Sequence, residues 1–559
     1  MNKFTGLLLA MLVAILGTPS LPVSDGEKNS SEGGKMVSRQ SSMAPGSAAS
    51  SATTWAALYG GSGSEEMEGV WATADGGYVV SGSTDSYGDP NGEAWILKLD
   101  QFGNIEWQKT YGGTGDEYII DIKQTGDGGY IGAGWTTSFG AGQMDFWVLK
   151  LDANGNIEWE KTYGGTRREQ GWSVEPTTDG GYIVAGGTLS FGAGGADYWV
   201  LKLGANGDIE WQRAYGGNGD DGGGGDYEEF VVRVLQDADG NYVVASETSS
   251  FGAGETDIWV IKLDADGNIL WEKAYGGSDE DTMWTFVEAS DGGYIIPGVT
   301  VSFSPDYSGD VWVLKLDKDG KILWQKVYAI PDNWYEALSV GSTSDGGALV
   351  GSYREEGETD WDLILLRLDT NGNALWQKVF EYGWDWPNAV QELPDGGYVV
   401  AGVAWPNPSP EDLWVLRLAQ DGTIDSSCSF PSDIPLTQDD TDSIITNTNA
   451  TVTETNVIPQ NSSATVQNSS TSPNYLCQAA PSPDCPGDLT GDNKVNLDDI
   501  MVAANGWGKH PGETGYDARV DRSGDGEITV DEVQWIAVRW GPCQQQGVAQ
   551  EPHPQPDGG

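Results

Sequence analysis

A repeat of about 50 residues constrains this chain more than any other feature. Its clearest copy is WVLKLDANGNIEWEKTYGG at 147–165, where two apolar runs flank an Asn-Gly pair. Seven copies are found by the aromatic residue of the YGG element, at Tyr59, Tyr111, Tyr163, Tyr215, Tyr275, Tyr328 and Phe380. The successive spacings are 52, 52, 52, 60, 53 and 52, and an insertion at 220–229 explains the long one. A regular period of this length is typical of propellers and solenoids.

Each copy carries four strand signals. In the third copy they fall at 171–177, from Tyr182 onwards, at 199–203 and at 209–215, with Asp-Gly and Asn-Gly turns between them. An Asx-Gly pair supplies the positive φ angles that a tight, right-twisted hairpin requires. Four short antiparallel strands per unit are typical of a propeller blade. The sequence therefore predicts an all-β seven-bladed propeller over 53–428.

The two ends of the repeat favour a closed ring over an open solenoid. The first copy begins at TTWAALYGG, which is only the last strand of a unit, and the seventh copy stops at DGTIDSSC before its own last strand. The strand around Trp55 can therefore complete the seventh blade and remove both free sheet edges. A solenoid would instead need distinct polar caps, which the sequence lacks.

Composition and patterning divide the rest of the 559 residues. Residues 1–22 combine Lys3 with an apolar run too short to span a bilayer, which predicts a secretory signal peptide in preference to a buried N-terminal helix. We expect a disordered spacer at 23–52, a Ser/Thr/Asn-rich linker at 429–484 with three glycosylation sequons, and a disordered tail at 544–559. A formal net charge of -55 argues against binding to nucleic acid or anionic lipid.

Two twelve-residue loops between the linker and the tail have the spacing of calcium-binding EF-hand loops. They are DLTGDNKVNLDD at 488–499 and DRSGDGEITVDE at 521–532, each followed by an apolar helical pattern. The first would offer ligands from Asp488, Thr490, Asp492, Lys494 (its carbonyl), Asn496 and Asp499, and the second from Asp521, Ser523, Asp525, Glu527 (its carbonyl), Thr529 and Glu532. Asp-rich surface turns would not explain the exact duplication at an offset of 33 residues, so we expect two bound calcium ions.

The duplicated loop-plus-helix segment resembles the type I dockerin module, over 485–543. This resemblance implies a small α-helical module that binds two calcium ions and docks onto a cohesin-like domain of another protein. Loop positions 10 and 11, which choose the cohesin in that family, are Leu497, Asp498, Val530 and Asp531 here, and these differ from the Ser-Thr of many members. Four cysteines allow three disulfide pairings, of which we favour Cys428 with Cys477 across the linker and Cys485 with Cys543 clasping the module.

The ring itself offers little catalytic chemistry. Its Trp-containing last hairpin, for example 263–271, is similar to the repeats of quinoprotein-like propellers, and its Gly-Gly and Trp content to those of kelch-like propellers. Both histidines lie outside the ring, which excludes a His general base there. One carboxylate recurs in every blade, at Glu93, Asp145, Asp197, Asp257, Asp310, Asp362 and Asp412, and we expect it to accept backbone N–H groups and not to catalyse. The repeated tryptophans of the last strand, Trp107, Trp159, Trp211, Trp271, Trp324 and Trp376, are predicted to pack between blades.

Departures from the repeat indicate where binding could occur. The last two copies lose the YGG element and gain aromatic residues at Trp334, Tyr335, Trp384, Trp386 and Trp405. These side chains could form a sugar-stacking face, or they could only reflect divergent packing beside the ring closure.

The leading hypothesis is a secreted, non-catalytic propeller that binds a protein or glycan and is attached to a cohesin-like partner by the calcium-loaded module. The alternative is a polysaccharide-degrading glycosidase that uses a carboxylate pair of the propeller. Two non-repeated carboxylates converging at one mouth of the ring would favour the enzyme.

Overall fold

The computed structural model describes residues 54–88, 92–223, 231–304, 309–329, 334–355, 361–405, 410–424, 428, 431–433, 437–440, 444–447, 451–454, 460–461, 464–469, 471, 474–478, 494–495 and 541–542. The chain divides into two units, Thr53–Ala479 and a second one formed by Met1–Ala52 with Ala480–Gly559. The described residues contain no helix with the length and apolar character of a membrane span.

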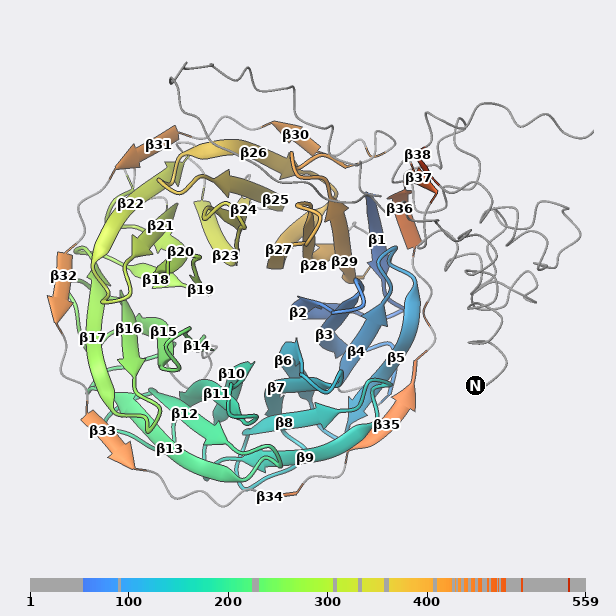
Figure 1. Cartoon of the computed structure of the whole chain (residues 1–559). Helices are drawn as coiled ribbons and strands as arrows, with labels where there is room; N and C mark the ends of the chain where they lie inside the picture. The colour runs from blue at the N-terminus through green and yellow to red at the C-terminus, as the bar shows by residue number, and fades with distance from the viewer. Residues whose placement is uncertain are drawn as a thin grey trace, which may run out of the picture. The chain divides into compact units, whose positions relative to one another are not determined.

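The first unit is the predicted seven-bladed propeller (Figure 1). Four antiparallel strands form the body of each blade, and blade 5 has its first strand in two pieces. Blades 1 to 3 comprise β2 (Glu65–Ala72), β3 (Tyr78–Thr84), β4 (Glu93–Leu99) and β5 (Ile105–Gly112); β6 (Glu117–Gln124), β7 (Tyr130–Thr136), β8 (Asp145–Leu151) and β9 (Ile157–Tyr163); β10 (Glu169–Pro176), β11 (Tyr182–Thr188), β12 (Asp197–Leu203) and β13 (Ile209–Gly216).

Blades 4 to 6 continue the pattern, with the first strand of each nearest the axis. They comprise β14 (Arg233–Gln236), β15 (Tyr242–Thr248), β16 (Asp257–Leu263) and β17 (Ile269–Gly276); β18 (Asp281–Met283), β19 (Val287–Glu288), β20 (Tyr294–Thr300), β21 (Asp310–Leu316) and β22 (Ile322–Ala329); β23 (Trp334–Ser342), β24 (Ala348–Glu355), β25 (Trp361–Leu368) and β26 (Ala374–Phe380).

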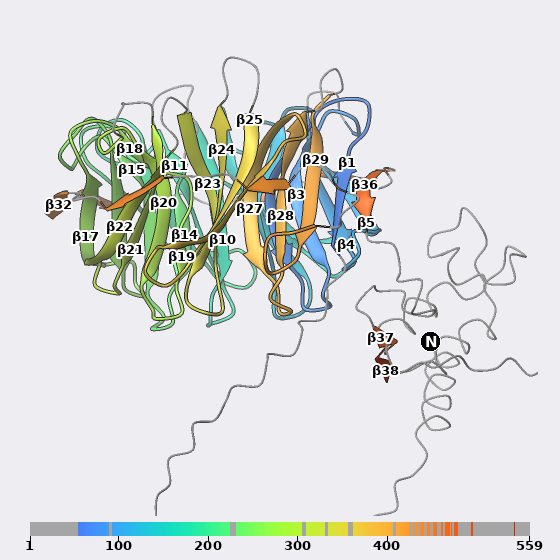
Figure 2. The same ribbon diagram turned by 90° about the horizontal axis from the view of Figure 1, so that it is seen from above.

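The ring closes as the sequence predicts. Blade 7 consists of β27 (Trp384–Glu392), β28 (Tyr398–Trp405), β29 (Asp412–Leu418) and the N-terminal strand β1 (Trp55–Tyr59). Trp55 lies opposite Arg417 and Tyr59 opposite Leu413, so the two ends of the repeat share one sheet. Because strands alternate in direction, the connections between blades lie on one face of the disc, which we call the junction face. The Asx-Gly hairpin turns lie on the other, the hairpin face (Figure 2).

The segment expected to be a linker instead supplies an outer strand to every blade, and we call 431–478 the belt. Its strands are β30 (Pro431–Asp433), β31 (Thr437–Asp440), β32 (Ile444–Asn447), β33 (Thr451–Glu454), β34 (Gln460–Asn461), β35 (Thr465–Asn468) and β36 (Asn474–Gln478). They pair in turn with the outermost strands of blades 6, 5, 4, 3, 2, 1 and 7, so the belt passes once around the ring (Figure 1). Short runs rich in Thr, Val and Ile suit this role, because each needs only one neighbour to pair with.

The repeated aromatic residues connect each blade to the next. The hydroxyl of Tyr111 donates a 2.7 Å hydrogen bond to the carbonyl of Gly155, and the Trp107 indole N–H donates a 3.1 Å bond to that of Ala153. Both acceptors belong to the hairpin turn of the following blade, where Gly155 has a φ of 70°. The predicted packing of this tryptophan set between blades is therefore confirmed, but Trp107 is only partly buried. The fully buried tryptophans come from the preceding strand, as Trp95 and Trp147 do, with the exception of Trp55 in β1.

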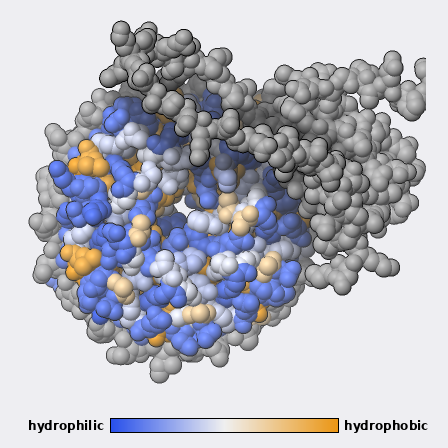
Figure 3. All heavy atoms as spheres, viewed as in Figure 1, coloured by the Kyte–Doolittle hydropathy of each residue, from blue (hydrophilic) through white to orange (hydrophobic). Residues whose placement is uncertain are grey.

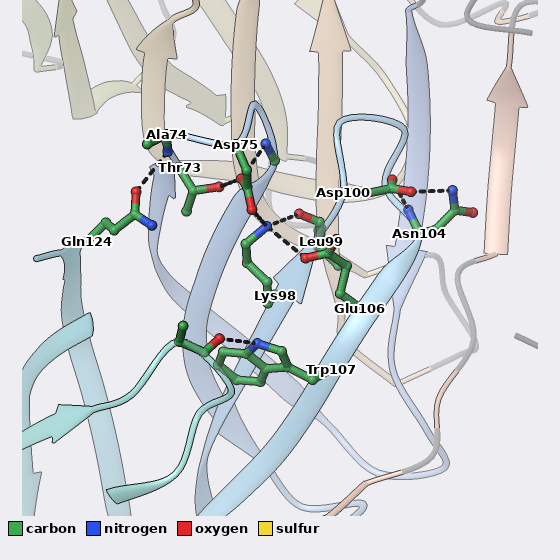
Figure 4. Close-up of polar contacts among 12 residues, drawn as sticks. Thr73, Ala74, Asp75, Lys98, Leu99, Asp100, Asn104, Glu106, Trp107 and Gln124 are labelled. Carbon is green, nitrogen blue, oxygen red and sulfur yellow. Dashed lines mark hydrogen bonds and ion pairs between the residues drawn. The ribbon is translucent and has the colours of Figure 1, made fainter. Parts of the chain in front are cut away.

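A second repeated interaction, an ion-pair network around a lysine, lies on the hairpin face (Figure 4). Nζ of Lys98 lies 3.0 Å from a carboxylate oxygen of Asp75 and 3.0 Å from one of Glu106, and it donates to the carbonyl of Leu99. Lys150 and Lys202 repeat the arrangement, and Arg367 and Arg417 take the lysine's place in the last two blades. The repeat itself thus fixes the hairpin face, so function is sought at the positions that vary.

The second unit is described only by β37 (Lys494–Val495) and β38 (Gly541–Pro542), which pair with each other. The helices, the remaining calcium ligands, the predicted signal peptide and both cysteines of the predicted dockerin-like module lie outside the described residues.

Candidate functional site

The first strands of the blades surround a central channel with two adjoining cavities, and Figure 3 shows an opening at the centre of the ring. The cavity toward the junction face, which we call the junction chamber, has a volume of about 270 Å³. The larger one toward the hairpin face, the hairpin chamber, measures about 490 Å³. Glu68, Arg233 and Asn388 line both cavities, so the two form one continuous passage.

Five aromatic side chains gather on the junction face where blades 6 and 7 meet, and we call them the aromatic cluster: Tyr353, Trp361, Trp384, Trp386 and Trp405. The ring of Trp361 stacks between those of Tyr353 and Trp384, at 5.3 Å and 25° in both pairs. Trp386 meets Trp361 edge-on at 5.7 Å, and Trp405 meets Trp384 at 4.8 Å. All five side chains are partly exposed, so the cluster presents aromatic surface to solvent.

The cluster occurs where the repeat breaks. In blades 1 to 4 and in blade 7 the first glycine of YGG lies against the repeated carboxylate, as Gly164 does against Asp145. Blade 5 has Ala329 at that position. Glu381 occupies that glycine's position after blade 6. There the repeated carboxylate, Asp362, accepts hydrogen bonds of 2.9 and 2.8 Å from Arg354, whose guanidinium also lies 3.4 Å from Glu381. Because side chains alternate along a strand, Arg354 and Asp362 lie on the face of the blade 6 sheet opposite Tyr353 and Trp361.

The repeated carboxylate has the structural role that the sequence predicts. Oδ2 of Asp145 accepts 3.0 Å hydrogen bonds from the backbone N–H groups of Ala141 and Gly142. Asp257 makes the equivalent bonds in blade 4. Each of these residues fixes the loop that precedes it, which leaves the non-repeated carboxylates as the candidates for chemistry.

Non-repeated carboxylates do converge on the junction chamber, from Glu66, Glu68 and Glu411. Burial raises the pKa of Glu66. Burial also raises the pKa of Glu411, and the negative charge of Glu66 raises it further. The chamber also holds Arg233, whose Nε donates a 3.1 Å hydrogen bond to the carbonyl of Trp284. Its walls are completed by Trp172, Trp284, Leu338, Trp386, Asn388, Met67 and Val403.

The hairpin chamber holds a compact charged group. Nζ of Lys123 lies 3.0 Å from Asp121 and 3.8 Å from Glu175, above the ring of Trp71 at 4.4 Å. Burial raises the pKa of Glu175 to about 7, although Lys123 offsets part of the effect. Burial alone would also raise the pKa of Asp121, but Lys123 and Arg233 together lower it. Lys123 is thus paired with carboxylates, but Glu68, Glu288 and Glu392 also line this chamber, so its described carboxylates outnumber its described cations.

The structure brings together three of the five predicted ligand-binding residues, Trp384, Trp386 and Trp405. The backbones of Trp334 and Tyr335 belong to β23, but their side chains lie outside the described residues. Tyr353 and Trp361 were missed, as were the chamber residues Glu66 and Glu411. A register comparison could have found two of them, because Trp361 and Glu411 both precede the repeated carboxylate, where earlier blades have Gly92, Met144, Ala196, Thr256 and Gly309.

The predicted calcium site cannot be built from the described part of the chain. Within it, no group of three or more His, Cys, Asp and Glu side chains is arranged to hold a metal ion. Of the twelve predicted ligands only Lys494 is described, by its backbone in β37. Cys428 is disulfide-bonded, and Cys477 lies opposite Ala56 in β36.

Comparison with known proteins supports the fold. The family model of a β-propeller domain of unknown function, DUF5122, matches residues 393–427, which include β28 and β29 of blade 7. No curated protein matches the chain.

Solved structures resemble the chain at low identity. Sqt1 of Chaetomium thermophilum is 14% identical, with a TM-score of 0.36 over 63% of this chain and 85% of that one. The subtype N11 neuraminidase-like protein of A/flat-faced bat/Peru/033/2010 is 12% identical, with a TM-score of 0.32 over 53% and 86%. The Bacillus subtilis arabinanase Arb43A is 12% identical, with a TM-score of 0.24 over 46% and 95%. Likenesses at this level carry no argument about what this chain binds.

Proposed function

We propose that the propeller is a glycan-binding domain and that the aromatic cluster is its binding surface. The observation that carries the proposal is the partly exposed stack of Tyr353, Trp361 and Trp384 at a blade junction where the repeat breaks. Aromatic side chains give a large contact area at little cost in conformational entropy, and they match the C–H face of a sugar ring. Ligand sites also combine such apolar walls with a few polar groups, and the exposed Glu381 lies at the same blade junction.

The test is binding of the full chain to a glycan array, followed by titration of the best ligand. Trp361→Ala removes the ring that contacts three others of the cluster, so we expect at least a roughly tenfold loss of affinity, because stacked aromatic pairs and their buried area together contribute more than 1.4 kcal/mol. Trp361→Phe should restore part of it. Phe251→Ala is the matched control, since Phe251 also lies against an aromatic neighbour, Trp259 at 5.0 Å, but in blade 4. Equal affinities of Trp361→Ala and wild type would overturn the proposal.

We further propose that the chain is secreted and attached to a cohesin-like domain through a calcium-loaded dockerin-like module at 485–543. The support is the duplicated loop pattern and the apolar N-terminal run, both features of the sequence. Binding of the full chain to a panel of immobilised cohesins, with calcium and with chelator, tests this attachment. Exchange of Leu497, Asp498, Val530 and Asp531 for the matching residues of another dockerin should then redirect the choice of cohesin.

A glycosidase is the second candidate function, and the convergence of Glu66 and Glu411 on the junction chamber favours it. Neither position carries a repeated carboxylate, and a raised pKa suits a general acid. Incubation with the glycan identified on the array separates the two functions. Release of reducing ends that stops in both Glu66→Gln and Glu411→Gln would establish the enzyme, and an intact glycan would leave the binding function.

A further inference from the structure

We propose that the junction chamber receives the terminal residue of the bound glycan and selects an amino sugar that carries a protonated amine. This inference rests on the proposed glycan binding at the aromatic cluster and names the ligand class of that same site. It is carried by the continuity of cluster and chamber, by polar atoms left without partners, and by the balance of charge.

Two residues connect the aromatic cluster with the chamber. Trp386 packs against Trp361 at 5.7 Å and also lines the chamber wall. Glu336 accepts a 2.6 Å hydrogen bond from the hydroxyl of Tyr353 in the cluster and another from the indole N–H of Trp284 in the chamber. A chain stacked on the cluster therefore has a continuous wall of side chains leading to the channel.

The chamber contains both a donor and an acceptor without partners among the described residues. The indole N–H of Trp172 and Oδ1 of Asn388 are buried and make no hydrogen bond there. Trp172 is only 4% exposed, so its N–H has little access to bulk water. A buried polar group without a partner costs about 1–3 kcal/mol, and a ligand that satisfies it recovers that energy. Sugar hydroxyls both donate and accept, so one residue could satisfy both atoms.

The charges in the chamber favour a cation. Three carboxylates, Glu66, Glu68 and Glu411, face one guanidinium, that of Arg233. Arg233 is already engaged with the Trp284 carbonyl, and its guanidinium lies over the ring of Trp172 at 5.9 Å. Among the described residues of this wall, which also contains three indole rings, carboxylates thus outnumber guanidinium groups by two. Carboxylates and indole faces are the groups that recognise an ammonium ion.

The size of the chamber restricts what can enter. A volume of about 270 Å³ is below the range of drug-sized ligand pockets, about 300–1,000 Å³, and far above the roughly 30 Å³ that one water occupies. It suits a single sugar residue and not an internal stretch of chain. Since the first strands of the blades close around the channel, the ligand would enter end-on from the junction face.

The experiment compares three β-1,4-linked tetramers, of glucosamine, N-acetylglucosamine and glucose, by calorimetric titration of the full chain at about pH 6, where an amine with an ordinary pKa is protonated. We expect the glucosamine tetramer to bind at least about tenfold more tightly than either neutral one, as one desolvated ion pair is sufficient for such a ratio. In the double variant Glu66→Gln/Glu411→Gln the three affinities should become equal. Glu255→Gln, which removes an exposed carboxylate of a junction-face loop, is the matched control and should keep the preference.

The outcomes separate this inference from the proposed function. Equal affinities of wild type for the three tetramers, or a preference for a neutral one, would overturn the amino-sugar assignment while a loss of binding in Trp361→Ala still upheld the aromatic cluster. If the Glu66→Gln/Glu411→Gln variant still preferred the glucosamine tetramer, the amine would bind outside the junction chamber, and this result would also overturn the assignment. Unchanged binding in Trp361→Ala would instead overturn the proposed function. Melting curves of all variants would show whether a loss of binding is a loss of fold.

Discussion

Oδ1 of Asp145 lies directly over Cα of Gly164, where a Cβ added to the glycine would stand only 1.6 Å from that oxygen. The same relationship holds between Asp197 and Gly216 at 1.8 Å and between Asp257 and Gly276 at 1.9 Å. The neighbouring carboxylate therefore leaves little room for a side chain at these glycines, whereas blade 5 combines Asp310 with Ala329 at the equivalent position. The chain changes both members together after blade 6, where Glu381 replaces the glycine and Asp362 turns to Arg354.

Gly164→Ala should destabilise the propeller by about 3 kcal/mol, because overpacking of a close-packed interior costs about 1–3 kcal/mol. Denaturant unfolding followed by tryptophan fluorescence measures the loss. In the double variant Asp145→Ala/Gly164→Ala the added methyl group no longer meets the carboxylate, so the cost of Gly164→Ala should nearly vanish in that background. Gly126→Ala is the control, since nothing lies within 4 Å of its added Cβ and other blades carry Ala74 and Ala238 at that position. Equal costs at 164 and 126 would contradict the relationship.

The buried carboxylates predict that the ring is most stable in mild acid. Burial raises the pKa of Asp145, Asp281 and Asp412 to about 6 and that of Asp197 to about 7, against 3.8 for the ordinary group. A raised folded-state pKa contributes stability that is fully present below the unfolded value and is lost as pH rises through 6 to 7. In the opposite direction, Asp127, Asp179 and Asp345 have pKa values of about 2, so they withdraw stability as pH falls from 3.8 toward 2.

We therefore expect the melting temperature of the ring to peak between about pH 4 and pH 5 and to fall toward pH 8. Thermal melts from about pH 3 to pH 8, at constant ionic strength, measure the profile. Asp197→Asn removes one of the raised groups and should flatten the decline above about pH 5. A melting temperature that rises steadily to pH 8 would show that these carboxylates are not buried as described.

A disulfide between Cys428 and Cys477 would close the belt on itself. Cys428 is disulfide-bonded and packs in the same core cluster as Ala56, and Ala56 is paired with Cys477. The resulting loop of roughly 50 residues encircles the propeller, and chain-entropy arguments give about 4 kcal/mol for a loop of that length. Cys428→Ser/Cys477→Ser should lose about that much in the free energy of unfolding, while Cys485→Ser/Cys543→Ser should leave the ring unchanged. Peptide mapping without reductant gives the pairing directly, and a link from Cys428 to Cys485 or Cys543 would refute it.

The two EF-hand-type loops predict binding of two calcium ions per chain. Calorimetric titration of the chelator-treated full chain should show two sites, and Asp488→Ala/Asp521→Ala should show none, because position 1 of each loop supplies a carboxylate ligand. Binding of the metal should also protect the second unit against proteolysis, since metal affinity becomes folding free energy in such small modules. Asp239→Ala/Asp266→Ala, at exposed hairpin turns of the ring, is the control. Two intact sites in the Asp488/Asp521 variant would contradict the assignment.

Much of the fold could be predicted because the same kinds of turn and strand residues recur in the seven copies of the repeat. The Asx-Gly turns, the Tyr and Trp of the last strand, and the closure of blade 7 by Trp55 all follow from local patterns. The belt could not be predicted, because short Thr-rich runs such as 437–440 have no hydrophobic period of their own and become strands only beside the edge of a blade. Composition described that segment correctly as polar, but it carries no information about an available partner.

Only part of the candidate site could be predicted from the sequence. Trp384, Trp386 and Trp405 stand out in the sequence because they break a repeated element. Trp361 and Glu411 also differ from the repeat, but each stands one residue before the repeated carboxylate. Because that carboxylate matches the other copies, the departure beside it is harder to recognise. Trp172 lies in β10, the first strand of blade 3, and Trp284 lies between β18 and β19, the two pieces of the first strand of blade 5. Only the closure of the ring shows that they share one chamber.

The path of the belt also sets the order in which the molecule can be completed. β1 is made first, yet its neighbours in the sheet are β29 and β36, so it must wait for almost the whole of Thr53–Ala479 to be synthesised. Each outer strand from β26 back to β5 likewise remains an open edge until the belt reaches it. A chain that ends after Leu418 could still close the ring, but it would leave seven unpaired edges, and with them seven sites for aggregation with other chains.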